Sequence, residues 1–361
     1  MDLTTNAHSP RTSPPLHIWV VSDGRAGIEN QALGLAEAVA RKTDARIFVK
    51  RLVWPRWMRR VPSRLIPAWP RLLDVGADDL TPPWPDLWIG NGRASIPLSI
   101  GVRRWSNHQT FVVQLQDPVR DPRLFDLVIP PRHDGLEGPN VFPIIGAAHR
   151  VITSRLQEAA SAFGAEIDAL PHPRVAVLIG GVAKAYRMSL SHSKRLADDI
   201  EGAVTRSGGS LMLTFSRRTP DDARKLLTDR LSHLPGVIWN DKGPNPYFAF
   251  LGAADVILVT EDSANMPAEA AASGAPVYLL PMEGGQARRR RFHEDLAAHG
   301  VTRPFTGALE SWTYPPLNET DRAAEEVIHR MSQPRLNPSA SDTRLHQIAA
   351  IRSRLRRIVG R

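Results

Sequence analysis

Short apolar runs and amphipathic stretches alternate along most of the chain, with polar loops between them. The apolar runs are typical of buried strands, whereas the stretch 29–41 repeats its apolar residues at helical spacing. The same alternation restarts after a proline-rich joint at 170–173. The predicted strands cover residues 17–22, 46–53, 85–89, 110–115 and 125–129 in the first half, and 174–179, 210–215, 237–238, 256–259 and 277–280 in the second.

This order predicts an α/β protein made of two Rossmann-like, doubly wound domains that face a cleft. We expect residues 1–15 to form a disordered leader, because they are polar and rich in Pro and Ser. Residues 16–160 and 161–335 are expected to form the N-terminal and C-terminal domains. Residues 336–361 are expected to form a basic amphipathic helix, which either packs on the protein or lies on an anionic membrane.

Polar residues or glycines follow nearly every predicted strand. Because parallel strands end at one edge of a sheet, we expect these positions to line the cleft. Gly180 and Gly181 can present bare N–H groups to a phosphate, and Arg217 can pair with a diphosphate through its guanidinium. Each glycine by itself is more often part of an ordinary turn. The candidate ligand-binding residues at these strand ends are Gly24, Asn91, Arg93, Gly180, Gly181, Ser216, Arg217 and Asn240.

The richest polar loop follows the predicted strand 256–259 and precedes an Ala-rich helix. Either Asp262 or Ser263 caps that helix, or the whole loop forms a ligand site at a helix N-terminus that attracts phosphate or carboxylate. Glu269, about two turns into the helix, can accept hydrogen bonds from ribose hydroxyls if it points into the cleft. The candidate residues of this unit are Thr260, Glu261, Asp262, Ser263, Met266 and Glu269.

Candidates for acid–base chemistry also stand at predicted strand ends. They are Asp23, Asp117 and His133, with His149 further along the chain. A lone histidine is usually structural or on the surface, but His133 lies between an arginine and an aspartate at a strand end, which makes it a candidate for proton transfer. The arginine run 288–291 opens the helix after the strand 277–280 and is either a solvated charge run or a contact for a phosphate or a headgroup.

The amino-acid composition narrows the kinds of chemistry and of partner that we expect. The chain has 361 residues and no cysteine, which suits two domains and excludes disulfides, thiolate catalysis and Cys-ligated zinc. The formal net charge of +9 favours an anionic partner such as a phosphorylated substrate or an anionic membrane. Arginine is spread along the whole chain and no RNA-binding signature is present, so we expect no nucleic-acid partner. We expect no cofactor and no bound metal.

The segment 54–85 breaks the alternation. It contains four of the chain's tryptophans among many Pro and Arg residues. We interpret it mainly as a packed irregular excursion, with an interfacial membrane patch as the alternative, because Trp and Arg together favour the depth of lipid headgroups.

Seven strings along the chain stand out: SDGRAGIENQALGLA from Ser22, FVVQLQDP from Phe111, FDLVIPPRHD from Phe125, FSRRTP from Phe215, IWNDKGPNPY from Ile238, VTEDSANMPAEA from Val259 and FHEDLAAHGVTRPF from Phe292. In combination they resemble the ELM-type (elongated mitochondria) fission protein family. The resemblance covers roughly residues 17–310, and a chain rich in Ala, Arg and Pro without Cys is typical of a bacterial member. Plant members of the family are implicated in recruiting a dynamin-related GTPase to the mitochondrial outer membrane.

The second half is also similar to the donor domain of GT-B glycosyltransferases and of UDP-N-acetylglucosamine 2-epimerases. That resemblance implies that Ser263 and the backbone after it contact a diphosphate, and that Glu269 contacts the ribose. The glycine-rich first loop of the lipid-acceptor GT-B enzymes is only partly present at residues 23–27.

Two functions follow as expectations. The first is a metal-independent, GT-B-like glycosyltransferase that takes a nucleoside-diphosphate sugar and acts on a lipid-linked cell-envelope acceptor. It would be cytoplasmic, at the inner face of the membrane. The second is a non-catalytic, membrane-associated adaptor that recruits a dynamin-like protein partner.

Overall fold

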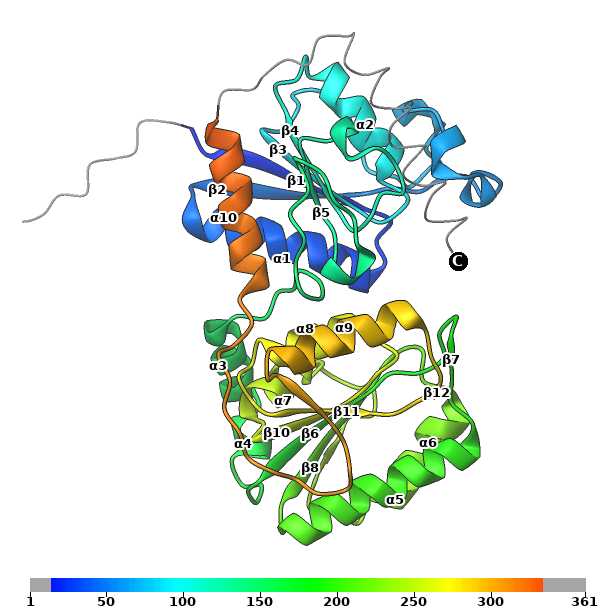
Figure 1. The fold of residues 1–361 in the computed structure, drawn as a ribbon, viewed down its shortest axis with the longest axis vertical. Coiled ribbons are helices and arrows are strands. Elements are labelled where there is room, and N and C mark those ends of the chain that lie inside the picture. The colour runs from blue at the N-terminus through cyan, green and yellow to red at the C-terminus, as the bar shows by residue number, and fades with distance from the viewer. Residues whose placement is uncertain (1–13, 334–361) are drawn as a thin grey trace, which may run out of the picture.

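The computed structural model describes residues 14–333. Two parallel sheets, each covered by helices, lie one above the other in Figure 1 and confirm the predicted pair of Rossmann-like domains. Most of the predicted leader and all of the predicted helix at 336–361 lie outside the described residues. No helix within residues 14–333 is both long enough and apolar enough to cross a bilayer.

The N-terminal sheet has five parallel strands in the order β2-β1-β3-β4-β5. Every residue of β3 and β4 is buried, as expected for a parallel sheet that is covered on both faces. Helix α1 (Ala26–Lys42) packs on one face and α2 (Ile96–Trp105) on the other. The strands are β1 (Leu16–Ser22), β2 (Ala45–Arg51), β3 (Leu87–Asn91), β4 (Phe111–Leu115) and β5 (Leu127–Ile129).

The C-terminal sheet has six parallel strands in the order β13-β11-β10-β6-β8-β9. One face carries α5 (Leu190–Ser207) and α6 (Asp221–Leu231). The opposite face carries α7 (Tyr247–Ala253), α8 (Asn265–Ala271) and α9 (Ala287–Ala298). The strands are β6 (Arg174–Ile179), β8 (Ser210–Phe215), β9 (Gly236–Ile238), β10 (Val256–Thr260), β11 (Val277–Leu280) and β13 (Thr302–Pro304), and a small antiparallel hairpin joins β7 (Tyr186–Arg187) to β12 (Glu283–Gly284).

Both sheets reverse their winding beside their first strand. The reversal lies between β1 and β3 in the N-terminal sheet and between β6 and β10 in the C-terminal sheet. Loops on the two sides of such a point run to opposite faces, so a crevice opens at the carboxyl ends of the strands. These crevices are the places where the fold can hold a ligand.

The predicted boundaries of the C-terminal domain need correction at both of its ends. Helix α10 (Glu319–Ser332), assigned from the sequence to the C-terminal domain, buries Ala324 and Val327 in the N-terminal core against α1. Conversely, α3 (Thr153–Ala162) packs against α7 of the C-terminal domain, although its residues precede the expected boundary. The amphipathic pattern of a helix shows that one face is buried, but it does not show against which sheet.

Specific hydrogen bonds fix the return of the chain to the N-terminal domain. The Glu319 carboxylate accepts a hydrogen bond from the Ile145 N–H at 2.6 Å, and the Thr320 hydroxyl accepts one from the His149 N–H at 3.0 Å. Because the chain crosses between the domains twice, at α3 and again before α10, the two halves of the cleft are held together on one side (Figure 1).

A tyrosine–glutamate pair joins α7 to α8 inside the C-terminal domain. The Tyr247 hydroxyl donates to the Glu269 carboxylate at 2.5 Å. Burial raises the pKa of Glu269 from 4.5 to about 7, although the hydrogen bond from Tyr247 acts in the opposite direction. The folded protein therefore retains a proton that the unfolded chain releases between these two pH values.

We expect Glu269→Gln to remove a pH-dependent loss of stability. As the pH rises from about 4.5 to about 7, the unfolded chain ionises this carboxyl first, so the free energy of unfolding of the native protein falls across that window and then levels off. The variant lacks this titration, so its stability relative to the native protein should increase between pH 5 and 8, by at most about 3 kcal/mol. Urea denaturation at several pH values measures the difference.

The matched control is Glu158→Gln on the exposed surface of α3. Its stability difference from the native protein should stay constant across the same pH range. A constant difference for Glu269→Gln as well would show that this carboxyl does not titrate as described.

Candidate functional site

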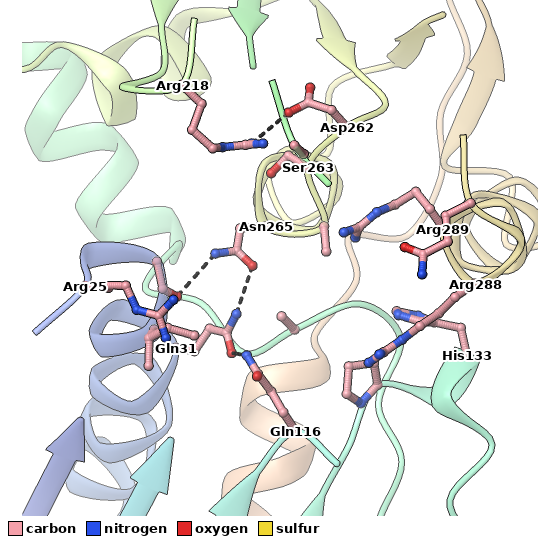
Figure 2. Close-up of a pocket in the computed structure, with 17 residues that line it drawn as sticks. Arg25, Gln31, Gln116, His133, Arg218, Asp262, Ser263, Asn265, Arg288 and Arg289 are labelled. Carbon is pink, nitrogen blue, oxygen red and sulfur yellow. Dashed lines mark hydrogen bonds and ion pairs between the residues drawn. The ribbon is translucent and has the colours of Figure 1, made fainter. Parts of the chain in front are cut away.

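A cavity of about 490 Å³ lies between the carboxyl ends of the two sheets (Figure 2). The N-terminal domain contributes the start of α1, Gln116 after β4 and His133 after β5. The C-terminal domain contributes Arg218 after β8, the loop that enters α8, and the start of α9. The charged side chains that line it are Arg25, Arg218, Arg288, Arg289 and Asp262, so arginines outnumber carboxylates four to one.

Asp262 organises the C-terminal wall of this cavity. Its side chain is fully buried and pairs with Arg218 at 2.7 Å. The carboxylate also accepts hydrogen bonds from the Thr260 hydroxyl at 2.7 Å and from the Gly181 N–H at 3.1 Å. Asp262 thereby ties together the loops that follow β6, β8 and β10, and it holds Arg218 at the cavity wall.

The two glycines after β6 have a different role from the expected one. The Gly180 N–H donates to the Thr260 hydroxyl at 2.7 Å, and the Gly181 N–H donates to Asp262, so neither is a bare donor for a phosphate. A Cβ atom at Gly180 would collide with the Asp262 carboxylate, and one at Gly181 would collide with the Arg218 carbonyl. These glycines are required because three loops approach one another closely.

An uncharged amide network crosses the cleft. The Gln31 side-chain oxygen accepts from Asn91 at 3.0 Å and from Gln116 at 2.9 Å, and the Gln31 amide donates to Asn265 at 2.8 Å. Asn265 in turn donates to the Gly27 carbonyl at 3.2 Å. The start of α1 and the start of α8 are therefore joined directly, as the dashed lines in Figure 2 show.

The first turn of α9 forms a basic wall. Cations at a helix N-terminus are unfavourable, because the helix dipole already places positive charge there. Arg288 has a partner, since it forms an ion pair with the buried Asp134 of the N-terminal domain. Arg289 is partly buried, and within residues 14–333 no carboxylate pairs with it and its buried Nε has no hydrogen-bond partner. Burial, reinforced by Arg288 and Arg218, lowers the pKa of Arg289.

His133 is the one predicted acid–base residue that lines the cavity. Its ring is 8% exposed, packs against Phe292 with 5.3 Å between ring centroids, and places Nε2 3.5 Å from the Asp134 carboxylate. Burial lowers the pKa of His133 to about 3, and the charges of Arg288 and Arg289 add to this shift. The imidazole is therefore neutral at physiological pH and can accept a proton.

The other predicted acid–base residues lie elsewhere. Asp23 pairs with Arg25 at 2.8 Å and lines a separate pocket of about 440 Å³ in the N-terminal domain. The Asp117 carboxylate accepts from the Val119 N–H at 2.7 Å and closes a turn. His149 is buried beneath α10. Asp23, Asp117 and His149 do not line the cleft cavity.

The loop 260–263 contains a helix-capping contact and also lines the cavity. The Ser263 hydroxyl accepts from the Met266 N–H at 3.2 Å, which is a capping contact, and Ser263 also lines the cavity. Glu261 points to the opposite side, where it accepts from the Met282 N–H at 2.8 Å. Glu269 is taken up by Tyr247, so its carboxylate does not reach the cavity.

Of the predicted site residues, the structure brings His133, Asp262 and Ser263 to the cavity. Arg217 is exposed, and its neighbour Arg218 lines the cavity in its place. The Ser216 hydroxyl accepts a hydrogen bond from the Arg218 N–H at 3.1 Å and shapes this turn. The remaining ones lie outside the lining: Gly24, Asn91 beneath the amide network, Arg93 against the carbonyls of Arg59 and Val61, exposed Asn240, and Met266 in the C-terminal core.

Gln31, Gln116 and Asn265 were not among the predicted site residues, and Arg289 was noted only as part of the arginine run 288–291. Gln116 directly follows a predicted strand, and Arg289 belongs to the noted arginine run, so position alone carried a signal for these two. Gln31 and Asn265 lie inside or at the start of helices, where the sequence gives no indication that they face each other across the cleft.

The described chain matches known proteins over most of its length. The family model "Mitochondrial fission ELM1" matches residues 26–331. Mitochondrial fission protein ELM1 of Arabidopsis thaliana is 34% identical over 275 residues, which cover 69% of this chain and 64% of that protein, so the chain spans less than two thirds of the relative. Uncharacterized protein RP120 of Rickettsia prowazekii is 25% identical over 357 residues, which cover 86% of this chain and 98% of that protein.

Among solved structures, UDP-GlcNAc 2-epimerase of Methanocaldococcus jannaschii gives a TM-score of 0.48 at 11% identity, with 93% of this chain and 100% of that chain covered. MurG of Acinetobacter baumannii gives 0.45 at 14% identity, with the same coverage. Likenesses at this level say nothing about the ligand of this chain. The match over residues 26–331 makes the chain a member of the mitochondrial fission ELM1 family.

Proposed function

We propose that the cleft binds a nucleoside-diphosphate sugar and that the protein transfers the sugar to a hydroxyl group of an acceptor. The observation that carries this proposal is Arg289, a cation without a carboxylate partner in the described chain, at the positive end of a helix and inside an inter-domain cavity. A buried, unpaired charge is costly unless an anion completes it. Guanidinium groups suit diphosphates, because their planar donors pair with two oxygens at once.

The cavity also suits this ligand by size and surroundings. Its volume of about 490 Å³ is typical of small-molecule sites, and it lies at the strand reversal of the C-terminal sheet. Arg218 and Arg289 would face the diphosphate, with Ser263 beside it. Uncharged amides such as Gln116 and Asn265 can bind sugar hydroxyls. Glu269 has no part in this proposal, because Tyr247 occupies its carboxylate.

In the proposed reaction, an acceptor hydroxyl attacks the anomeric carbon of the sugar. The bond from that carbon to the diphosphate oxygen breaks, and the acceptor proton passes to the neutral His133. Asp134, which is adjacent to the ring, would stabilise the resulting imidazolium. Arg218 and Arg289 would stabilise the negative charge that develops on the leaving diphosphate.

The relatives suggest a second candidate. One is named a mitochondrial fission protein, which favours an adaptor role in binding another protein. An adaptor does not need an inter-domain cavity in which a neutral histidine lies beside an arginine that no carboxylate of residues 14–333 pairs with. If the adaptor role were the true one, variants of Arg289 and His133 would leave partner capture unchanged and the folded protein would bind no nucleotide sugar.

We expect Arg289→Gln to weaken binding of a nucleoside-diphosphate sugar by about 10- to 100-fold, because a charge-assisted hydrogen bond is lost. Calorimetry with a panel of UDP-, GDP- and CMP-sugars measures this. Arg290→Gln is the matched control, since Arg290 faces a separate pocket outside the cleft. Equal affinity in both variants, or no heat from any sugar nucleotide with the native protein, would contradict the proposal.

We expect His133→Gln to reduce kcat by about 10²- to 10⁴-fold with little change in donor affinity, since it removes the base and keeps a polar side chain. In the native protein, kcat/KM should stay level as the pH falls to about 5, because the pKa of His133 lies near 3 in the free protein and the ring remains neutral. A fall centred near the ordinary histidine pKa of about 6.5 would exclude this residue as the base.

A further inference from the structure

A strongly basic segment stands between β2 and β3 of the N-terminal domain. Residues 53–73, here called the basic excursion, contain five arginines and no acidic residue. Three one-turn 3-10 helices run through it: Met58–Arg60, Ser63–Leu65 and Pro70–Leu72. In Figure 1 it is the light-blue segment that projects from the side of the N-terminal domain.

The inner side of the basic excursion is firmly anchored. The buried Trp54 donates from its ring nitrogen to the Ala94 carbonyl at 3.0 Å, and Met58 is buried in the same core. Arg93 donates to the carbonyl of Arg59 at 3.0 Å and also to that of Val61. The expected packed excursion is therefore present on this side, and the segment forms a fixed platform.

The outer side of the basic excursion exposes large apolar side chains. Trp57, Leu65 and Trp69 are 67%, 65% and 64% exposed. Burying such side chains is favourable by about 1.5–3 kcal/mol each, so leaving three of them in water on an anchored platform is unfavourable unless something covers them.

No carboxylate among the described residues pairs with the arginines of this segment. Arg56, Arg60, Arg64 and Arg71 are exposed, and none of them forms an ion pair with another residue between 14 and 333. Tryptophan and arginine together suit the interface of a bilayer, where the ring lies at headgroup depth and the guanidinium contacts phosphate. Anionic lipid complements a surface with this charge.

We propose that the basic excursion docks on an anionic lipid bilayer, with Trp57, Leu65 and Trp69 inserted at headgroup depth and the arginines on lipid phosphates. Its position suits this role. The pocket of about 440 Å³ beneath it is lined by Leu52, Trp54, Met58 and Ile66, and shares Arg25 with the cleft cavity. A docked bilayer would thus lie beside a partly apolar pocket next to the cleft.

Co-sedimentation of the full chain with vesicles tests the docking. We expect binding to vesicles that mix phosphatidylcholine with phosphatidylglycerol, little binding to phosphatidylcholine alone, and weaker binding at high salt because the attraction is screened. No binding to either vesicle, or equal binding to both, would overturn the proposal.

Two variants assign the surface. Replacing Trp57, Leu65 and Trp69 by Ser, or Arg56, Arg60, Arg64 and Arg71 by Gln, should each lower vesicle affinity more than about tenfold. A matched control replaces the exposed Arg46, Arg104, Arg187 and Lys194 by Gln, which removes the same charge elsewhere and should change affinity less than about threefold. Equal losses in the control would mean that net charge alone attracts the protein, and would overturn the assignment.

Four further measurements keep the result unambiguous. Unchanged thermal unfolding of the variants shows that they are folded, because the substituted side chains are exposed. The assignment would be overturned if deleting residues 334–361 abolished vesicle binding while the excursion variants still bound. It would also be overturned if duplex DNA displaced the vesicles at equal phosphate concentration. Calorimetry with sugar nucleotides is read separately, so failure of vesicle binding and failure of the proposed cleft function are distinguishable.

Discussion

The buried carboxylate of Asp262 is the constraint on which the site depends. A carboxylate without solvent must be fully paired, and Asp262 obtains its partners from Thr260, Gly181 and Arg218. Those partners belong to loops after three different strands. Because none of the loops can move without leaving the charge unpaired, the carboxylate fixes the crevice at the strand reversal of the C-terminal sheet. Arg218 then stands at the cavity wall as a by-product of that pairing.

The cleft is closed by contacts of two different kinds. Gln31 and Asn265 join the domains by neutral hydrogen bonds, whereas Arg288 and Asp134 join them by an ion pair. Neutral amide contacts exchange readily with water or with a ligand, since each is worth only about 1 kcal/mol net. The ion pair has a second effect, because it neutralises Arg288, whereas no carboxylate between residues 14 and 333 neutralises Arg289 in the same turn. Pairing within the protein therefore selects which arginine is available to an anion.

The sequence predicted the layers of the fold better than the side chains of the site. The run Val256–Val259 is apolar throughout because it is buried on both faces, so both the strand and the polar loop that follows it could be predicted from the sequence. The sequence could not predict which of the adjacent Arg217 and Arg218 faces inward, because that choice depends on the turn that Ser216 shapes. Glu269 was misplaced for a similar reason: its partner Tyr247 is distant in sequence, and only tertiary packing brings them together. The docking of α10 on the first domain is likewise a long-range choice.

The positions where the chain departs from local rules are the positions where a binding surface is proposed. Arginines in the first turn of α9 oppose the helix dipole, and exposed tryptophans on an anchored platform oppose the hydrophobic effect. By contrast, the unfavourable burial of Asp262 is fully compensated within the protein, and Asp262 is accordingly structural. When the fold itself compensates a locally unfavourable residue, that residue has a structural role. When the fold leaves such a residue uncompensated, the residue points to a partner outside the chain. By that criterion we propose two separate binding surfaces: Arg289 for a small anion, and the outer side of the basic excursion for a lipid surface.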